Sequence, residues 1–192
     1  MNVEKELCLF AHIPVFTVGR LNDYPFRLMV QGDLNTTNEA GARVTNRVRA
    51  TYDEKGENPV FSTATKFRSP RKEGSVDTHA PQVEFTIPED DFKTIMGACA
   101  SRYVKRRYTV PLPSGVKVEI DRYLECEEPY VFSKIVKIDI EGGDEAQIDV
   151  YLAEMRDLGF HVGTIINPPG VESPEIKERI DELMGRTWNL VK

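Results

Sequence analysis

Polar and apolar residues alternate along most of the chain, and this pattern predicts a series of β-strands with two different faces. In residues 116–124, valine and isoleucine share one face, while charged side chains and a tyrosine occupy the other. Residues 104–110 alternate in the same way, and residues 111–115 between them contain two prolines and a glycine, which are typical of a turn. The two segments therefore predict a β-hairpin that carries cations and carboxylates on one side.

Further strands are predicted wherever the same period of two is bounded by turn residues. Two other stretches, residues 11–25 and 69–81, are rich in turn-forming and charged residues and are expected to be loops. Together with the hairpin at 103–124, the expected strands are residues 2–10, 26–34, 43–52, 59–68, 82–87 and 131–141.

Three segments instead favour helices, which we expect at residues 88–100, 144–158 and 173–185. Gly159 follows the second helix and is expected to end it, because glycine is favoured just after a helix C-terminus. The apolar stripes of the first two helices are Phe92, Ile95, Met96 and Cys99, and Ile148, Tyr151, Leu152, Met155 and Leu158.

About eight strands with two or three helices predict an α+β fold, namely a closed eight-stranded antiparallel β-barrel flanked by the helices. A barrel of eight strands is just wide enough to hold one small ligand. If the helices cover the apolar strand faces, the charged faces line the lumen. Buried charge is costly unless it is paired, hydrogen-bonded or bound to metal, so we expect a wet and occupied interior.

Composition limits the classes of function. The 192 residues are 40% apolar and 29% charged, which fits one ordinary soluble domain. A net charge of -6 argues against binding to duplex nucleic acid. Three scattered cysteines argue against a disulfide framework, and neither a membrane span nor a signal peptide is recognisable, so a cytoplasmic location is expected. Apolar strand faces are compatible with a homodimer, although no segment singles one out.

Like charges recur two positions apart on the expected strands. The cation pairs are Arg47 with Arg49, Lys66 with Arg68, and Lys105 with Arg107, and the carboxylate pairs are Glu4 with Glu6, Glu119 with Asp121, and Asp139 with Glu141. Guanidinium and ammonium groups bind phosphate oxygens, and hard cations such as Mg²⁺ bridge carboxylates to phosphates. Both signs in one lumen therefore indicate a metal–polyphosphate site, whose ligand would be a small-molecule triphosphate or nucleotide.

The order of these motifs resembles the CYTH family, the triphosphate tunnel metalloenzymes, which include class IV adenylyl cyclases, thiamine triphosphatases and inorganic triphosphatases. The resemblance covers about residues 2–163, the expected tunnel domain (1–163), and leaves 164–192 as a C-terminal helix and tail. The motifs, in order, are Glu4-x-Glu6, Gln31-Gly-Asp-Leu34, Arg47-x-Arg49, Thr65-Lys66, Glu84, Lys105-x-Arg107-Tyr108, Glu119-x-Asp121 and Asp139-Ile-Glu141-Gly142.

The resemblance implies a role for each matched position. It implies Mg²⁺ or Mn²⁺ as the cofactor and a catalytic role for Glu6, Lys66, Arg107 and Glu141. The implied metal ligands are Glu4, Glu6, Glu119, Asp121, Asp139 and Glu141, with Glu84 as a weaker candidate. The implied phosphate-binding residues are Arg47, Arg49, Lys66, Lys105 and Arg107, and the alternation adds Arg68 and Lys137.

Two positions depart from the family pattern. The first motif of the family is E-x-E-x-K, and Cys8 stands in the place of its lysine. The late E-I-E strand begins with Asp139, whose side chain is one methylene shorter. Lys137 shares the face of Asp139 and is a candidate to supply the missing cation.

Three functions follow as hypotheses. The first is metal-dependent hydrolysis of a nucleotide or another organic or inorganic triphosphate inside the tunnel. The second is a non-catalytic tunnel that binds or sequesters a nucleotide or phosphorylated signal, in which Cys8 marks the loss of catalysis. The third is a class IV-type adenylyl cyclase, in which a ribose hydroxyl lies in line with the α-phosphate.

Overall fold

A computed structural model of the chain describes residues 2–37, 43–68, 77–126, 131–163, 165 and 182. It describes only the backbone of residues 2–6, 35–37, 43, 68, 77–80, 126 and 131. The described residues form eight antiparallel strands, three α-helices and one short 3-10 helix. The α+β class and the eight antiparallel strands predicted from the alternation are confirmed.

The elements follow one another along the chain in a simple order. The strands are β1 (Asn2–His12), β2 (Phe26–Thr37), β3 (Arg43–Tyr52), β4 (Val60–Arg68), β5 (Asp77–Thr86), β6 (Ser101–Pro111), β7 (Lys117–Cys126) and β8 (Val131–Glu141). The helices are α1 (Val15–Leu21), α2 (Glu89–Ala98) and α3 (Ile148–Asp157), and the 3-10 helix η1 (Glu145–Gln147) leads into α3.

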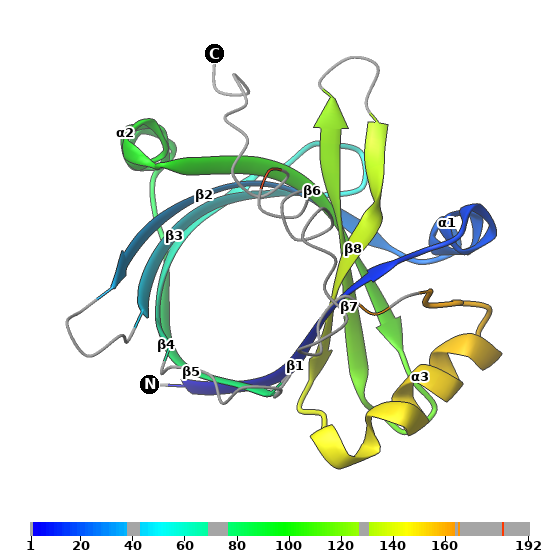
Figure 1. Cartoon of the computed structure of the whole chain (residues 1–192). Coiled ribbons are helices and arrows are strands. Elements are labelled where there is room, and N and C mark those ends of the chain that lie inside the picture. The colour runs from blue at the N-terminus through cyan, green and yellow to red at the C-terminus, as the bar shows by residue number, and fades with distance from the viewer. Residues whose placement is uncertain are drawn as a thin grey trace.

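The strands are hydrogen-bonded in the order β1-β5-β4-β3-β2-β6-β7-β8, and β8 pairs again with β1, so the sheet closes into a barrel (Figure 1). β1 makes this closure with its two ends. Residues 2–7 pair with β5, and residues 6–12 pair with β8. The predicted hairpin is formed by β6 and β7, which are joined by the turn at residues 112–116.

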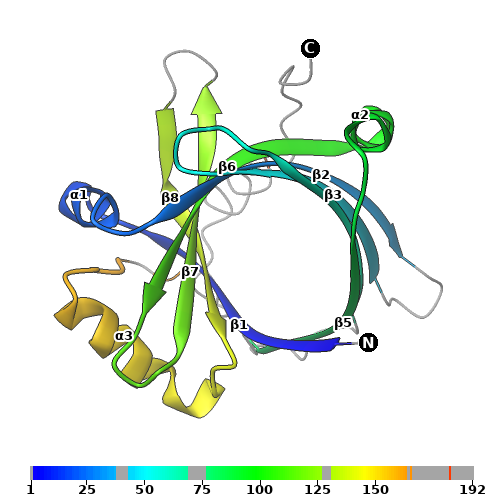
Figure 2. The same cartoon turned by 180° about the vertical axis from the view of Figure 1, so that it is seen from behind.

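Two apolar clusters lie outside the barrel, under helices that Figures 1 and 2 show on opposite sides of it, with α2 on one side and α1 and α3 on the other. The larger cluster packs α1 and α3 against β1, β6, β7 and β8, and the smaller one packs α2 against β2, β3 and β4. Gly32 on β2 lies directly beneath α2, because an added Cβ there would stand 2.6 Å from Cys99 Sγ and 2.7 Å from Met96 Sδ. The helices therefore cover apolar strand faces, as the alternation predicts. None of the helices in the described ranges has the length and apolarity that a membrane span requires.

The loop predicted for residues 11–25 is wrong, because it contains α1. Its sequence has weak helix formers, including two valines, a threonine and a glycine, so local propensity does not reveal the helix. Tertiary contacts hold it instead. Leu21 is fully buried in the larger cluster, and the Thr17 hydroxyl donates to the carbonyl of His161 over 3.2 Å and accepts from its N–H over 3.1 Å.

The predicted loop at 69–81 is also partly wrong, because β5 already begins at Asp77. Residues 77–82 pair with β1, and this partner, some 75 residues away in sequence, satisfies their backbone groups. Residues 69–76 lie outside the described residues, and so does the predicted helix at 173–185 except for Glu182, which is helical. The other predicted elements agree with the structure to within a few residues, and Gly159 has the positive φ of 87° expected just after a helix.

Candidate functional site inside the barrel

The charged strand faces point into the barrel. Val118, Ile120 and Ile138 pack in the outer cluster, so the alternating residues between and beside them face the interior. Lys105 and Asp121 are 3% and 0% exposed, which shows that these charges are buried inside the molecule rather than spread on its surface.

Asp121 is the centre of one ion-paired group, the Asp121 cluster, which comprises Lys105, Arg107, Glu119, Asp121, Lys137 and Asp139. Arg107 donates to both oxygens of Asp121, with Nε at 2.6 Å from Oδ1 and Nη2 at 2.7 Å from Oδ2. The Lys105 ammonium contacts Oδ2 as well. Both carboxylate oxygens of Asp121 are therefore engaged by cations from the neighbouring strand β6.

Arg107 joins Asp121 to two further carboxylates. Its Nη1 contacts Glu119, and its Nη2 lies 3.7 Å from Asp139 Oδ2, the oxygen that also contacts the Lys137 ammonium. The Asp121 cluster is thus a connected network across β6, β7 and β8 (Figure 1).

The network favours the ionised forms of Asp121 and Asp139. Burial alone would raise the pKa of Asp121, but the charges of Arg107 and Lys105 hold it well below its ordinary value. Burial would also raise the pKa of Asp139, but the charges of Lys137 and Arg107 lower it. The interior therefore holds carboxylates and cations in ion pairs, while burial and the neighbouring Arg107 lower the pKa of Lys105 well below its ordinary value.

A second polar group, the Asp33 cluster, lies on β2, β3 and β6 and comprises Gln31, Asp33, Arg47, Arg49 and Tyr103. Asp33 accepts hydrogen bonds from the Tyr103 hydroxyl (2.9 Å), the Gln31 amide (3.1 Å) and Arg47 Nε (3.3 Å). These groups lower the pKa of Asp33 against the opposing effect of burial. Arg49 donates through Nε to the Gln31 amide oxygen over 3.3 Å, so a neutral group rather than a carboxylate receives it.

A third set of charges lies where the Asp121 cluster approaches the surface. Lys117 Nζ is 2.5 Å from Glu141 Oε2 and 3.4 Å from Glu119 Oε1. Burial and the neighbouring Glu119 raise the pKa of Glu141, while Lys117 acts against them. The strand register pairs Glu141 with Glu6 on β1.

The carboxylates predicted to bind metal are only partly available for it. Glu119, Asp121, Asp139 and Glu141 all lie on β7 and β8, but Asp121 has both oxygens committed to cations. Asp139 Oδ1 is different, because it is buried and has no hydrogen-bond partner among the described residues. An uncompensated carboxylate oxygen beside Glu119 fits a hard divalent cation. No group of three or more metal-binding side chains is found among the described residues.

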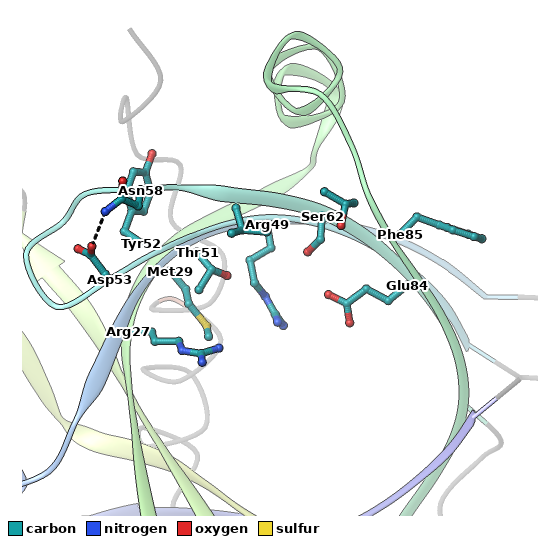
Figure 3. Close-up of a pocket in the computed structure, with 12 residues that line it drawn as sticks. Arg27, Met29, Arg49, Thr51, Tyr52, Asp53, Asn58, Ser62, Glu84 and Phe85 are labelled. Atoms are coloured by element: carbon teal, nitrogen blue, oxygen red, sulfur yellow. Dashed lines mark hydrogen bonds between the residues drawn. The ribbon is translucent and has the colours of Figure 1, made fainter.

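A pocket of about 620 Å³ opens at one mouth of the barrel, between the start of β2, the end of β3, the start of β4 and the end of β5 (Figure 3). We call it the mouth pocket. Arg49, Met29 and Glu84 point into the barrel there, whereas the ring of Phe85 points away from it. The lining residues are Arg27, Met29, Arg49, Thr51, Tyr52, Asp53, Asn58, Val60, Ser62, Glu84, Phe85 and Thr86.

The structure brings most of the predicted site residues to the barrel interior. Lys105, Arg107, Lys137 and the four β7–β8 carboxylates form one connected set, and Arg47 and Arg49 belong to the Asp33 cluster. Lys66 is buried on β4, in register with Gln82 of β5. The side chains of Glu4, Glu6 and Arg68 lie outside the described residues, so the roles proposed for them stay predictions.

Sequence reasoning assigned no role to several residues of the site. Asp33 and Gln31 were recognised as a motif, and their spacing of two residues could have identified them as an inward pair. Tyr103 could have been found in the same way, because it lies two residues before Lys105. Arg27 is two positions before Met29 on β2, so the same spacing places it on the inward face, but only the structure shows that it is exposed at the mouth of the barrel.

Cys8 is buried, and the strand register pairs it with Asp139. Its thiol contributes to the environment of the buried Tyr123 hydroxyl, whose pKa is raised mainly by burial and by Asp121. Lys137 is paired with the next inward position of β1, Phe10, and its ammonium contacts Asp139. The geometry therefore places a cation beside the carboxylate that faces Cys8.

Comparisons with solved structures show which fold this is. The putative adenylyl cyclase HpAC1 from Hippeastrum, reported to have a dominant triphosphatase activity, aligns over 98% of this chain and 99% of its own, with 14% identity and a TM-score of 0.53. The PH1819 protein from Pyrococcus horikoshii OT3 aligns over 92% and 99%, with 14% identity and a TM-score of 0.51. No protein-family model and no curated protein matches the sequence.

These structure neighbours are CYTH-type proteins, so the resemblance predicted from the motif order is confirmed at the level of the fold. The neighbours span almost the whole described barrel together with its outer helices. A likeness at 14% identity assigns no activity to this chain, which has to be argued from its own residues.

Proposed function

We propose that the barrel binds the phosphates of a triphosphate and hydrolyses it with a divalent cation, Mg²⁺ or Mn²⁺. The observation that carries this proposal is the concentration of buried cations on inward strand faces, with Lys66 and Lys105 only 6% and 3% exposed. Arginine and lysine side chains converging on one enclosed space suit an elongated polyanion, since guanidinium groups bind phosphate oxygens in pairs.

The fixed orientation of these cations would help to position the phosphates of a bound triphosphate. Arg107 is held by two hydrogen bonds to Asp121, and Arg47 is held by Asp33, so their charges need little reorganisation when a ligand arrives. Phosphoryl transfer depends mainly on such positioning and on charge stabilisation. The proposed catalytic residues remain Glu6, Lys66, Arg107 and Glu141.

A divalent cation fits the carboxylates on one side of the interior. Asp139, whose Oδ1 has no hydrogen-bond partner among the described residues, would hold it together with Glu141 and with Glu4 and Glu6 on the neighbouring strand. Asp121 and Glu119 would not, because cations already contact both oxygens of each carboxylate. When bound, the cation would neutralise phosphate charge next to these carboxylates. The fold neighbour HpAC1, reported as a triphosphatase, is consistent with this reaction class.

A second candidate, a tunnel that binds without cutting, is favoured by a specific observation. Among the described residues, the inward carboxylates Asp33, Asp121 and Glu119 are all paired with cations. Cys8 also stands where the family pattern has a lysine, buried opposite Asp139. In such an interior, the phosphates of a ligand would replace the carboxylates as partners of the cations, and no metal would be needed.

One experiment separates the two functions. Phosphate and pyrophosphate release would be measured from inorganic triphosphate, thiamine triphosphate and the common nucleotides, with Mg²⁺ or Mn²⁺ and with chelator. Glu6→Gln would be compared with Glu57→Gln, which alters an exposed loop carboxylate. Metal-dependent release that is lost only in Glu6→Gln supports hydrolysis, and retention of activity in Glu6→Gln would overturn the metal assignment.

The other outcomes identify the alternatives. Ligand-dependent thermal stabilisation in chelator, with no release of phosphate or pyrophosphate under any condition, would support the binding tunnel. Formation of a cyclic nucleotide together with pyrophosphate would show that the enzyme is a cyclase.

A further inference from the structure

Cys8 faces the barrel interior, at the position where the family pattern has a lysine. Its neighbours Leu7 and Leu9 pack in the larger outer cluster, so the side chain between them points inward. Cys8 is 4% exposed and lies directly opposite Asp139 of β8 in the strand register. Both residues contribute to the raised pKa of Tyr123, although burial and Asp121 contribute more, so both lie near the same hydroxyl. The barrel therefore brings a thiol and a carboxylate together in one buried place.

The two carboxylate oxygens of Asp139 have different surroundings. Oδ2 contacts the Lys137 ammonium and lies 3.7 Å from Arg107 Nη2. Oδ1 is buried and has no hydrogen-bond partner among the described residues. A buried carboxylate oxygen without a partner costs free energy, and a bound cation removes this cost. Oδ1 is therefore the atom of this carboxylate that a metal ion would bind.

The spacing of residues across an antiparallel strand pair suits a metal site. The Cβ atoms of directly opposite residues are about 4.5–5.5 Å apart. A zinc ion binds sulfur at about 2.3 Å and a carboxylate oxygen at about 2.0–2.2 Å, so one ion can bridge a cysteine and an aspartate in such a pair. The next inward pair along the same two strands joins Glu6 to Glu141. Glu6, whose side chain lies outside the described residues, is the expected third ligand.

A row of carboxylates on β8 connects this place with the surface. Glu141 lies two residues after Asp139 on the same inward face, and its side chain is 36% exposed, against 2% for Asp139. Lys137 contacts Oδ2 of Asp139, so it leaves the Oδ1 side open to an ion that arrives from Glu141. The buried thiol and carboxylate therefore have the entry path that a metal site needs.

The thiol changes which ion this place would prefer. Oxygen ligands alone suit Mg²⁺, which binds carboxylates and water in a strict octahedral arrangement. A thiolate is a soft ligand that selects zinc over such hard ions. A lysine in the place of Cys8 would offer no ligand to any metal, because its ammonium group only donates hydrogen bonds. The departure from the family pattern thus adds a metal ligand and, with it, a different preference.

We propose that Cys8 and Asp139 form a thiolate–carboxylate metal site, which makes the barrel bind Zn²⁺ in preference to Mg²⁺. The proposal rests on the proposed function for the role of the cation, since it names the class of ion that would neutralise the phosphates. Binding of the ion itself requires no triphosphate. On binding, the Cys8 thiol releases its proton to the solvent, and its sulfur and Asp139 Oδ1 become ligands.

Titration with Co²⁺ tests the site without substrate and without activity. Co²⁺ can replace Zn²⁺ in such sites, and a thiolate ligand gives it a near-ultraviolet charge-transfer band that oxygen ligands do not give. The chain has three cysteines, so the double variant Cys99→Ser/Cys126→Ser leaves Cys8 as its one thiol. The spectra of the wild type, the double variant, Cys8→Ser and Asp139→Asn would be recorded, and Zn²⁺ or Mg²⁺ would then be added in competition.

The expected band depends on Cys8. It should appear in the wild type and in the double variant with one Co²⁺ per chain, and it should be absent from Cys8→Ser. Zn²⁺ should displace Co²⁺, whereas Mg²⁺ at about a hundredfold excess should not. Calorimetry should show that Cys8→Ser and Asp139→Asn each weaken Zn²⁺ binding at least about tenfold. Mg²⁺ binding should change less than about twofold in Cys8→Ser, because Mg²⁺ does not use the sulfur.

Several outcomes would overturn the site. Absence of the band from the double variant would exclude Cys8 as a ligand, and so would a band that persists in Cys8→Ser. Displacement of Co²⁺ by an equal concentration of Mg²⁺ would contradict the preference for Zn²⁺. If Cys8→Ser does not fold, the double variant still decides, because it changes no residue of the proposed site.

The same spectra separate this proposal from the proposed function. Mg²⁺-dependent hydrolysis of a triphosphate by a chain that gives no band would overturn the thiolate site and leave the proposed function standing. A Cys8-dependent band in a chain that hydrolyses no triphosphate with any ion would support the site and contradict the hydrolysis.

Discussion

The barrel interior and its mouth carry the same kinds of charged residue, but only those of the interior are joined in ion pairs. In the Asp121 cluster each cation is matched with a carboxylate, and Asp121 itself is fully buried. At the mouth, Arg27 and Arg49 line a pocket of about 620 Å³ together with the carboxylates Glu84 and Asp53, and neither arginine forms an ion pair with a described residue. A buried charge must be neutralised within the protein, whereas a charge at an opening can remain solvated until a ligand arrives.

The alternating charges of the strands suggest one site, but the ion pairing divides it into two parts with different tasks, stability and ligand binding. The interior network holds its charges in place and contributes to the stability of the folded chain. The mouth is free to change its partner, so its effect should fall on ligand binding. The following variants test this division, from the largest expected effect to the smallest.

Asp121→Asn should destabilise the fold most, because it leaves Lys105 and Arg107 buried without their shared carboxylate. We expect a loss of about 3–5 kcal/mol in the free energy of unfolding, measured by urea denaturation. The same change at Asp149, an exposed carboxylate on α3, is the control and should stay within about 0.5 kcal/mol. A small effect at Asp121 would mean that the interior is not held by its ion pairs.

The same network predicts how stability depends on pH. The pKa of Asp121 is lowered in the folded chain, against the opposing effect of burial, by Arg107 and Lys105. The contribution of Asp121 to the free energy of unfolding is therefore complete above its unfolded pKa of 3.8. It is lost as the pH falls from 3.8 toward the lower pKa of the folded chain. Urea midpoints measured between pH 7 and pH 3 should fall more steeply for the wild type than for Asp121→Asn. Equal slopes would contradict the ion-paired assignment.

Gly32→Ala should have a moderate effect on stability and a small one on the mouth. The added Cβ would meet Cys99 Sγ and Met96 Sδ well inside van der Waals distance, so α2 has to shift. Overpacking of this kind costs about 1–3 kcal/mol, to be measured by thermal denaturation. Gly19→Ala, where no atom lies within 4 Å of an added Cβ, is the matched control. Unchanged stability in Gly32→Ala would show that α2 does not pack closely on β2.

Lys66→Met should weaken the binding of inorganic triphosphate about tenfold, because it removes one buried cation from the proposed phosphate site. Calorimetry in chelator measures this loss without catalysis. Lys134→Met, which removes an exposed lysine of β8, controls for net charge. Should both variants bind alike, Lys66 would have no direct contact with the phosphates.

Glu84→Gln should have the smallest effect and the opposite sign. Removing the carboxylate that faces Arg49 makes the charge of the mouth pocket more positive, so inorganic triphosphate binding should tighten about two- to fivefold at low salt. The gain should shrink as the ionic strength rises, which titrations at several salt concentrations would reveal. Weaker binding would indicate that Glu84 contacts the ligand, directly or through a metal.

Much of the fold followed from local patterns. Alternation gave the eight strands and their charged faces, and a period near 3.6 gave α2 and α3 with their buried stripes. The elements that escaped prediction depend on distant partners. α1 is stabilised by packing rather than by propensity, and the first residues of β5 are ordered by pairing with β1.

The candidate site divides in the same way. The sequence by itself determined which side chains share an inward face, since the direction of a side chain on a strand depends on its immediate neighbours. Only the tertiary structure decided which charges meet. Arg107 reaches carboxylates on two other strands, Asp33 meets Tyr103 from 70 residues away, and Arg27 joins the mouth. These contacts depend on strand order and register, which are set by long-range pairing around the closed sheet and leave no local signal in the chain.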